Sequence, residues 1–527
     1  MSPLAVLLLL LGFALWGVHF EAYEAVVNAQ FNGALTGSPM GDMYVYSHLF
    51  TNCLFPTLYL LAPSFPFYPT LTFAIISIST LLFSIKVPKQ WWLAIVLVLI
   101  AFGANFFWIS NLRICILTTC FGLAIAFLNP KNKSIVTIGL LLAAYGSSVR
   151  YEGGVLVILL TLGFCIGTNT FNLRLHKFTY IGAIMLCLFV VLKEEQVAKQ
   201  NPYLDRLHNL TYLTSVSDTK LQKTDGNADN ALFIEALNMY FVSDTAFFNK
   251  MASALPQSQN LLWQKSKQLF TLNENILHTW QQLWQYCQAE ILTSLLLIIF
   301  VIATSHKAWR MLLANLVLFG TLTYILAATK AEIRFASPYL LFIALVNFLV
   351  LYKNKSQIQP ALLSLCIMPF AILSMQKLSV IKEDQQKVEK QNQKYIATLN
   401  ALPHTIIALN MNSVNIFNTS VLANTGFAKN KKIMPIDMGD YTCITSIHQH
   451  LNKQFGINSM DLKKTYAYLS NNKEVIYLSS EERTIFIAKY LKQLYGLDIH
   501  FEPLPMPAFQ IDGNKIWLYQ LKQMSQP

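Results

Sequence analysis

Apolar runs of roughly 16–20 residues recur along this chain, and they limit its possible folds more than any other feature, because such runs approach the length that spans a bilayer. Only 13% of the 527 residues are charged, about half the share of a typical soluble domain. We therefore expect a polytopic α-helical membrane protein with about eleven spans. The predicted spans are 3–18, 69–85, 91–108, 113–128, 135–149, 154–170, 178–192, 289–304, 311–328, 337–352 and 360–376.

Basic residues mark every second connection between these spans. Five connections carry Lys or Arg and almost no acid, and the positive-inside rule places such connections in the cytoplasm. They are 86–89, 129–133, 172–177, 305–310 and 352–355. The N-terminus is then expected inside and the C-terminus outside.

This topology requires that the apolar segment 43–66 does not cross the membrane. Four prolines between 56 and 69 interrupt it, which favours a re-entrant or interfacial helix on the outer face. If the segment crossed, the basic connections from 86 to 177 would face outward. The first run has no basic n-region before it and no A-x-A site after it, so it is interpreted as a retained span.

The outer connections carry charges close to the membrane boundary. The first external loop, 19–68, contains Glu21, Glu24 and Asp42 but no Lys or Arg. The later outer connections carry Arg113, Arg150, Glu152, Lys330, Glu332 and Arg334. Two interpretations stay open for this second group. The residues pair with one another, or they line an external polar cavity that meets an anionic ligand.

Two extramembrane parts are expected. Residues 193–288 form a polar external insertion, and tryptophan spacing near its end predicts an amphipathic helix leading into the next span. Residues 377–527 form an external tail that begins with a charged helix. Strands are predicted at 405–409, 414–417, 474–479, 499–504 and 515–521, and helices at 441–455 and 481–496. This alternation indicates a small α/β domain.

Several common functional signatures are absent from the sequence. It contains no P-loop, zinc signature, GxSxG motif or dinucleotide fingerprint, which argues against an ATP-driven pump or a soluble-type hydrolase. The tail shows no basic stripe of the kind that binds nucleic acid, so no nucleic-acid partner is expected.

Three stretches together resemble the GT-C class of polyprenyl-phosphate-sugar-dependent glycosyltransferases, of bacterial type. "FEAYEAVVNAQFNG" is similar to the acidic first loop of these enzymes, with Glu21 at the second carboxylate of their doublet and Phe20 at the first. "SSVRYEGGVLVIL" is similar to their "RYEG" signature, and "AEIRFASPYLLFIALV" to a stretch whose Arg helps to hold the lipid phosphate. The resemblance covers about 1–376, which would be the GT-C-like transmembrane domain.

The resemblance implies a function on the external face. A sugar would move from a polyprenyl-phosphate carrier to a glycan, lipid or protein acceptor, with inversion. Glu21 would take the acceptor proton, and Glu24 or Asp42 would support it or hold a divalent ion such as Mg or Mn. The lipid phosphate would meet four basic residues of the outer connections, namely Arg113, Arg150, Lys330 and Arg334. Glu152 would lie among these basic residues. The expected location is the bacterial inner membrane, with surrounding lipid as a further partner.

Two other classes remain open. A transporter or flippase would carry charges in the middle of its spans, whereas the ionisable residues here collect at the boundaries, and no inverted repeat is visible. A non-catalytic membrane scaffold, or an inactive relative of the enzymes, would only display its tail domain.

Overall fold

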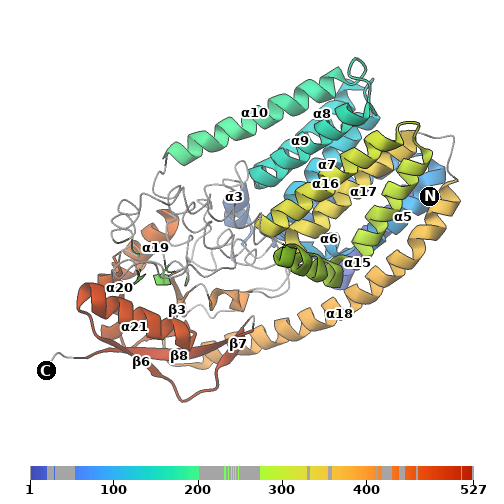
Figure 1. Ribbon diagram of the computed structural model, residues 1–527. Helices are drawn as coiled ribbons and strands as arrows, with labels where there is room; N and C mark the ends of the chain where they lie inside the picture. Colours follow the sequence, from blue (N-terminus) through green and yellow to red (C-terminus); the bar gives the residue numbers. More distant parts are fainter. Residues whose placement is uncertain are drawn as a thin grey trace.

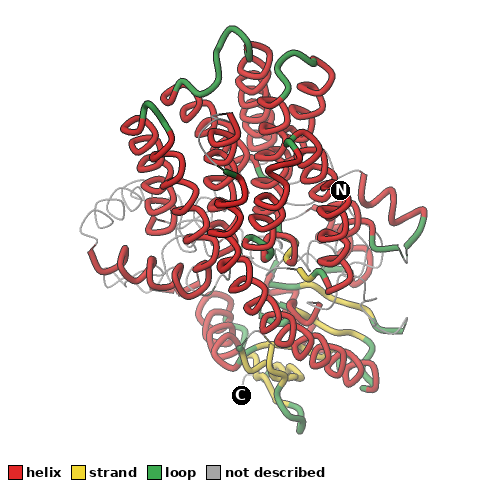
Figure 2. The backbone as a smooth tube through the Cα atoms, turned by 90° about the vertical axis from the view of Figure 1, so that its right-hand side faces the viewer, coloured by secondary structure: helices red, strands yellow, loops and turns green. Residues whose placement is uncertain are grey.

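The computed structural model describes most of the chain. The described residues are 2–20, 29, 54–63, 65–200, 231–232, 235–236, 239, 241, 244, 247, 273–328, 333–353, 359–410, 412–417, 430–437, 445–457, 461–511 and 513–524. Figures 1 and 2 both show a bundle of helices, with the strands of the tail gathered beyond one end of it. We call this the tail end of the bundle.

Each of the eleven predicted apolar runs is helical, but the predicted span 91–108 is divided after Ala101 into α5 and a second short helix, Ala104–Phe107. The helices are α1 (Ser2–Gly17), α4 (Phe67–Lys86), α5 (Trp92–Ala101), α7 (Asn111–Leu128), α8 (Lys133–Val149), α9 (Tyr151–Thr168), α10 (Lys177–Gln200), α15 (Asn273–Thr304), α16 (Ala308–Ala328), α17 (Ile333–Lys353) and α18 (Pro360–Ala401). Among the described residues, seven are long and apolar enough to cross a membrane, namely α4, α7, α9, α15, α16, α17 and α18. The chain thus has the architecture of an integral multi-pass membrane protein.

Burial separates the central helices from those that face lipid. In α17, 94% of the most apolar window is buried, against 22% in α16. The helix α7 is also buried along nearly its whole length. Large apolar side chains are exposed on α10 and α16, including Ile181, Met185, Leu312 and Leu316. Since lipid solvates such side chains, α7 and α17 form the core and α10 and α16 its periphery.

Glycines allow α7 and α8 to approach closely. A Cβ atom on Gly122 would lie 2.4 Å from the carbonyl oxygen of Gly139, and one on Gly139 would lie 2.5 Å from that of Gly122. Small residues at facing positions are a common means of helix association in lipid, where there is no hydrophobic drive between helices. The contact therefore depends on both residues lacking a side chain.

A reciprocal amide pair joins α16 to α17. Asn315 Nδ2 donates to Asn347 Oδ1 at 3.0 Å, and Asn347 Nδ2 donates to Asn315 Oδ1 at 2.7 Å, with both residues buried. Each amide also donates to a main-chain carbonyl one turn earlier in its own helix. The pair satisfies polar groups that lipid would leave unpaired.

Replacing Asn347 by leucine should lower the free energy of unfolding by about 1–2 kcal/mol, because the buried amide of Asn315 loses its partner. The double variant Asn315→Leu/Asn347→Leu should recover most of that loss, since no polar group is then stranded. Thermal unfolding of the detergent-solubilised chain measures both, with Tyr324→Leu on the exposed face of α16 as control. A double variant that is destabilised by the sum of the two single changes would contradict this account.

The helix α15 is kinked where it enters the bundle. Cys287 has non-helical angles (φ −127°, ψ 29°), so the carbonyls just before it lose their helical partners. Lys377 of α18 donates to the carbonyl oxygen of Gln285 at 3.1 Å and also to that of Tyr286. A lysine from the last long helix thus satisfies the groups that the kink exposes.

The predicted insertion is helical at both of its ends. The helix α10 continues past the predicted end of its span at 192 to Gln200, and α15 begins at Asn273. The predicted amphipathic helix before the span is thus present from Asn273 onward.

The apolar segment 43–66 contains a short helix, α3 (Leu54–Leu61). The hydroxyl of Tyr59 accepts from the main-chain N–H of Tyr68, at 3.1 Å, and the ring of Phe55 packs edge-on against Tyr68 at 5.2 Å. An eight-residue helix is about 12 Å long, less than half of the hydrocarbon core. This helix therefore lies against the start of α4 and is too short to cross.

The tail is joined to the bundle without a break. The helix α18 runs for 42 residues, about 63 Å, roughly twice the thickness of the hydrocarbon core. The predicted border between 376 and 377 falls inside it. Figure 1 shows α18 passing along the bundle and on into the tail. The charged half of α18 thus projects beyond the apolar part of the molecule.

A mixed sheet with helices forms the tail. The strands are β3 (Ile406–Leu409), β4 (Lys432–Pro435), β5 (Val475–Ser479), β6 (Ile499–Pro503), β7 (Phe509–Ile511) and β8 (Asn514–Gln523), and the helices are α19 (Thr445–Phe455), α20 (Leu462–Asn471) and α21 (Glu481–Tyr495). The order is β4-β3-β5-β8-β6, with β7 on β8. The strands β4, β3 and β5 are parallel, whereas β8 runs antiparallel to its neighbours. The predicted α/β class of the tail is confirmed.

Several local predictions in the tail are corrected. Residues 414–417 form a 3-10 helix rather than a strand, because hydrogen bonds from Ser413 to Asn410 and from Ile416 to Ser413 close tight turns there. The short strands β4 and β7 and the helix α20 were not expected. The predicted left-handed cap of α21 at Gly496 is confirmed, with φ 62°.

The insertion and the tail meet, although they lie far apart in the sequence. Phe241 packs edge-on against Phe486 and Tyr490 of α21, at 5.4 and 5.0 Å between ring centroids. Lys489 contacts Glu235 at 2.6 Å, and the Tyr490 hydroxyl donates to Asp244 at 2.9 Å. The described part of the insertion is therefore docked on α21.

Candidate functional site

Two short strands bring the first loop to the tail end of the bundle. β1 (His19–Phe20) pairs in parallel with β2 (Trp108–Ile109), which precedes α7. The Ser110 hydroxyl caps α7 by accepting the main-chain N–H of Arg113 at 3.3 Å. The chain therefore enters the acidic loop directly beside the start of α7. Glu21, Glu24 and Asp42 themselves lie outside the described residues.

A buried cation lies in the first turn of α7. Arg113 is buried, and its Nη1 donates to Oδ1 of Asn105 at 2.9 Å. Asn105 belongs to the short helix α6 (Ala104–Phe107) and is itself held by the carbonyl oxygen of Phe102 at 3.3 Å. Burying a guanidinium in an apolar bundle is costly unless partners surround it. Arg113 thus has its place fixed by neighbouring helices.

A buried carboxylate lies close to this cation. Glu290 of α15 is buried and accepts from the Ser337 hydroxyl of α17 at 3.4 Å. Arg113 and Lys377 lie near enough to attract it electrostatically. Arg334, which is half-buried, stands one turn before Ser337 at the start of α17. The Arg113–Asn105 contact therefore joins α7 to α6, and the Glu290–Ser337 contact joins α15 to α17, both at the tail end of the bundle.

Arg150 and Glu152 form an ion pair at the start of α9. Arg150 Nε lies 3.5 Å from Glu152 Oε2, and the side chains are 41% and 42% exposed. The pairing interpretation holds for these two residues, although an exposed pair contributes little to stability. The carbonyl oxygen of Arg150 accepts from Cys115 Sγ at 2.9 Å, which ties the start of α9 to α7.

The structure brings Arg113, Arg150 and Arg334 to one end of the bundle, because α7, α9 and α17 all begin there. Lys330 and Glu332 lie outside the described residues. Glu290 and Lys377 were not singled out from the sequence. The signal for both was present, since each is an ionisable residue at the edge of an apolar run. Within the described residues, no group of three or more His, Cys, Asp or Glu is placed to hold a metal ion.

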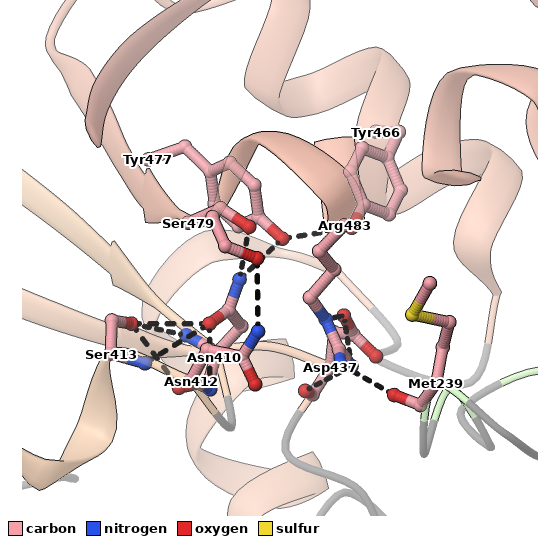
Figure 3. A network of polar contacts seen from close by, with 10 residues as sticks. Met239, Asn410, Asn412, Ser413, Asp437, Tyr466, Tyr477, Ser479 and Arg483 are labelled. Carbon is pink, nitrogen blue, oxygen red and sulfur yellow. Dashed lines mark hydrogen bonds and ion pairs between the residues drawn. The ribbon is translucent and has the colours of Figure 1, made fainter. Parts of the chain in front are cut away.

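A second polar cluster lies in the tail, at the carboxyl edge of the three parallel strands (Figure 3). Asn410, after β3, donates to the Tyr477 hydroxyl at 2.9 Å and to Ser479 Oγ at 2.8 Å. Arg483 of α21 contacts Asp437, after β4, at 2.7 Å, and donates to the carbonyl oxygen of Met239 at 2.6 Å. Burial raises the pKa of Tyr477, so its hydroxyl stays protonated and available to donate.

In open α/β sheets, ligands commonly bind outside the carboxyl ends of parallel strands. Here that edge is occupied by side chains that bond to one another and are buried, including Asn410, Asp437 and Ser479. Arg483 extends the cluster to the insertion through Met239. The tail cluster therefore fastens the insertion to the sheet. The cluster at the tail end of the bundle is the candidate functional site, because the partly exposed Arg150 and Arg334 lie at the same end, where the acidic first loop begins.

The fold and the cluster define the class as a multi-span membrane protein with an α/β tail and buried charges at the tail end. No protein-family model, curated protein or solved structure matches this chain. Its function is therefore argued from its own residues.

Proposed function

We propose that this chain is a GT-C-like membrane glycosyltransferase, which moves a sugar from a polyprenyl-phosphate carrier to an acceptor on the external face. The observation that carries the proposal is the buried cluster of Arg113, Asn105, Glu290 and Ser337, which lies beside the entry to the acidic first loop. Transfer from a lipid phosphate needs a base for the acceptor and cations for the departing phosphate. The tail end of the bundle supplies the cations, and the first loop, which carries Glu21, Glu24 and Asp42, begins at the same end.

Contacts between distant parts support the sidedness of the proposal. The pairing of β1 with β2 fits an even number of crossings between residues 20 and 108. In this proposal α4 makes one crossing, α5 and α6 together make the other, and α3 does not cross. The docking of the insertion on the tail requires an even number between them, which fits α15, α16, α17 and α18. When the positive-inside rule is added, the first loop, the connection before α7, the insertion and the tail all lie outside the cytoplasm in an eleven-span topology.

In the proposed mechanism, Glu21 accepts the proton of the acceptor hydroxyl, and Glu24 or Asp42 supports it. Arg334, which is half-buried, faces the phosphate of the carrier, whose negative charge grows as the glycosidic bond breaks. Arg113 is buried and contributes positive charge from inside the bundle. A divalent ion such as Mg or Mn would be held by the acidic residues of the first loop, whose oxygen atoms suit it. Arg150, which is half-exposed with Glu152, would stand at the edge of the site.

The test uses the purified full chain in lipid nanodiscs with a labelled polyprenyl-phosphate sugar. Glu21→Gln should abolish transfer and keep carrier binding, because the amide preserves shape but cannot accept the proton. Arg334→Ala should weaken binding of the carrier roughly 10- to 100-fold, as expected for a lost charge-assisted contact of about 1.5–3 kcal/mol. Glu24→Gln and Asp42→Asn should have graded effects. Arg310→Ala, which is half-buried like Arg334 but lies at the opposite end of the bundle, is the matched control.

Each rival class gives a different result. A scaffold would tolerate all four changes, and a transporter would lose uptake without any glycosidic product. If Glu21→Gln keeps full transfer while Asp42→Asn abolishes it, then Asp42 is the base. Full transfer in Glu21→Gln, Glu24→Gln and Asp42→Asn alike would remove the acidic loop from the mechanism.

A further inference from the structure

Two lysines from different helices lie over one aromatic ring at the end of the bundle opposite the tail. Lys133 Nζ is 4.9 Å and Lys177 Nζ is 5.4 Å from the centroid of the Phe178 ring. Lys133 is the first residue of α8 and Lys177 the first residue of α10, and both are exposed. Two positive charges are thus gathered at one place on the surface.

Nothing acidic in the neighbouring sequence balances these charges. The chain has no Asp or Glu between Asp42 and Glu152, and none between Glu152 and Glu194. Exposed Lys131 and Arg174 add two more positive charges in the connections that lead into α8 and α10. A lysine in the first turn of a helix also meets the positive end of the helix dipole. An anion at this place would relieve the repulsion.

An apolar stripe begins directly beside the lysines. On α10 the exposed side chains recur every three or four residues, at Phe178, Ile181, Met185, Leu188 and Leu192. The adjacent helix α8 exposes Ile138 and Leu141. A Cβ atom on residue 182 would lie 2.4 Å from the side chain of Leu140. Because Gly182 has no Cβ, α10 can pack closely against α8. The stripe has the length and the character to receive an acyl chain.

We propose that the start of the α8–α10 pair binds an anionic phospholipid. Its phosphate lies between Lys133 and Lys177, and its acyl chains lie along the exposed stripe of α10. The positive charges of the lysines favour an anionic headgroup. Because the apolar stripe of α10 begins directly beside these lysines, a lipid with acyl chains fits the site better than a soluble phosphate. Basic pockets between helices at a membrane interface bind lipid headgroups in this way. The site is independent of the proposed glycosyl transfer.

The test measures lipid binding to the purified full chain by native mass spectrometry. Phosphatidylglycerol should bind more tightly than phosphatidylcholine with the same acyl chains. Lys133→Gln/Lys177→Gln should weaken phosphatidylglycerol binding roughly 25-fold, about fivefold for each lysine. The conservative pair Lys133→Arg/Lys177→Arg should keep it. The matched control Lys86→Gln/Lys89→Gln removes the same charge from the connection between α4 and α5 at the same end, and should leave binding unchanged.

Three outcomes would overturn the proposal. Equal losses in the Lys133/Lys177 and Lys86/Lys89 variants would mean that binding follows total charge. Unchanged binding in the Lys133/Lys177 variant would mean that the lysines hold no headgroup. Glycerol phosphate competing as strongly as the lipid at equal concentration would mean that the stripe on α10 takes no part. Thermal unfolding without added lipid checks that every variant is folded.

Discussion

Replacing Gly139 by leucine should destabilise the bundle by about 3 kcal/mol, because the new side chain cannot be placed between α7 and α8. Its Cβ alone would lie 2.5 Å from the carbonyl oxygen of Gly122 and 2.9 Å from the main-chain nitrogen of Ala126. Both are backbone atoms, which cannot move aside as a flexible side chain would. Thermal unfolding in detergent, with the recovery of monodisperse protein, measures the loss.

Gly163 of α9 is the matched control. A Cβ there would meet nothing within 4 Å, and leucine has a higher helix propensity than glycine by up to about 1 kcal/mol. Gly163→Leu should therefore leave stability unchanged or slightly raised, whereas Gly139→Ala should already show part of the loss. Equal behaviour of Gly139→Leu and Gly163→Leu would show that α7 and α8 do not depend on this close approach.

Replacing Arg483 by methionine should destabilise the tail by about 3–5 kcal/mol, because it leaves the carboxylate of Asp437 buried without its partner. The pair is 2% and 0% exposed at a distance of 2.7 Å, so water cannot replace the guanidinium. The carbonyl oxygen of Met239 loses a donor at the same time. Hydrogen exchange of the intact chain should therefore show faster exchange in α21 and in the insertion together.

An exposed ion pair on the same helix provides the comparison. Lys492 contacts Asp498 at 2.9 Å, but the side chains are 65% and 45% exposed, so Lys492→Met should cost less than about 1 kcal/mol. Combining Arg483→Met with Asp437→Asn should recover part of the loss. Asparagine removes the buried charge and tolerates the left-handed backbone of residue 437, which has φ 51°. If Arg483→Met and Lys492→Met behave alike, the buried pair is not what holds the tail together.

The candidate site was predictable only in part. Arg113 stood out as a charge at a membrane boundary, and the structure places it in the buried cluster. Glu290 shares that cluster but did not stand out, because its importance depends on Ser337 and Arg113, which belong to other helices. The pairing of Arg150 with Glu152 could be predicted, because the two residues are only two positions apart in the sequence. Glu21 keeps its predicted role as a proposal.

Local properties of the sequence determined the helices. Hydropathy predicted a helical structure in each of the eleven runs, although it did not predict the break between α5 and α6. The glycine after α21 predicted its cap at Gly496. Short elements such as β4 were missed because a four-residue stretch that begins with a lysine holds too little pattern. Pairing with β3 stabilises it as a strand. Residues 414–417 had a strand-like composition, but turn hydrogen bonds at Asn410 and Ser413 decided otherwise.

The apolar helices of membrane length, the alternating basic connections and the α/β tail follow from local sequence, because neighbouring residues carry hydropathy, charge and periodicity. Long-range packing sets the contact of Gly122 with Gly139, the electrostatic effect of Arg113 on Glu290, and the docking of the insertion on α21 through Arg483 and Tyr490. Contacts such as that between Met239 and Arg483 join residues more than two hundred positions apart. Their partners are chosen by the packing of whole helices, which no local pattern records.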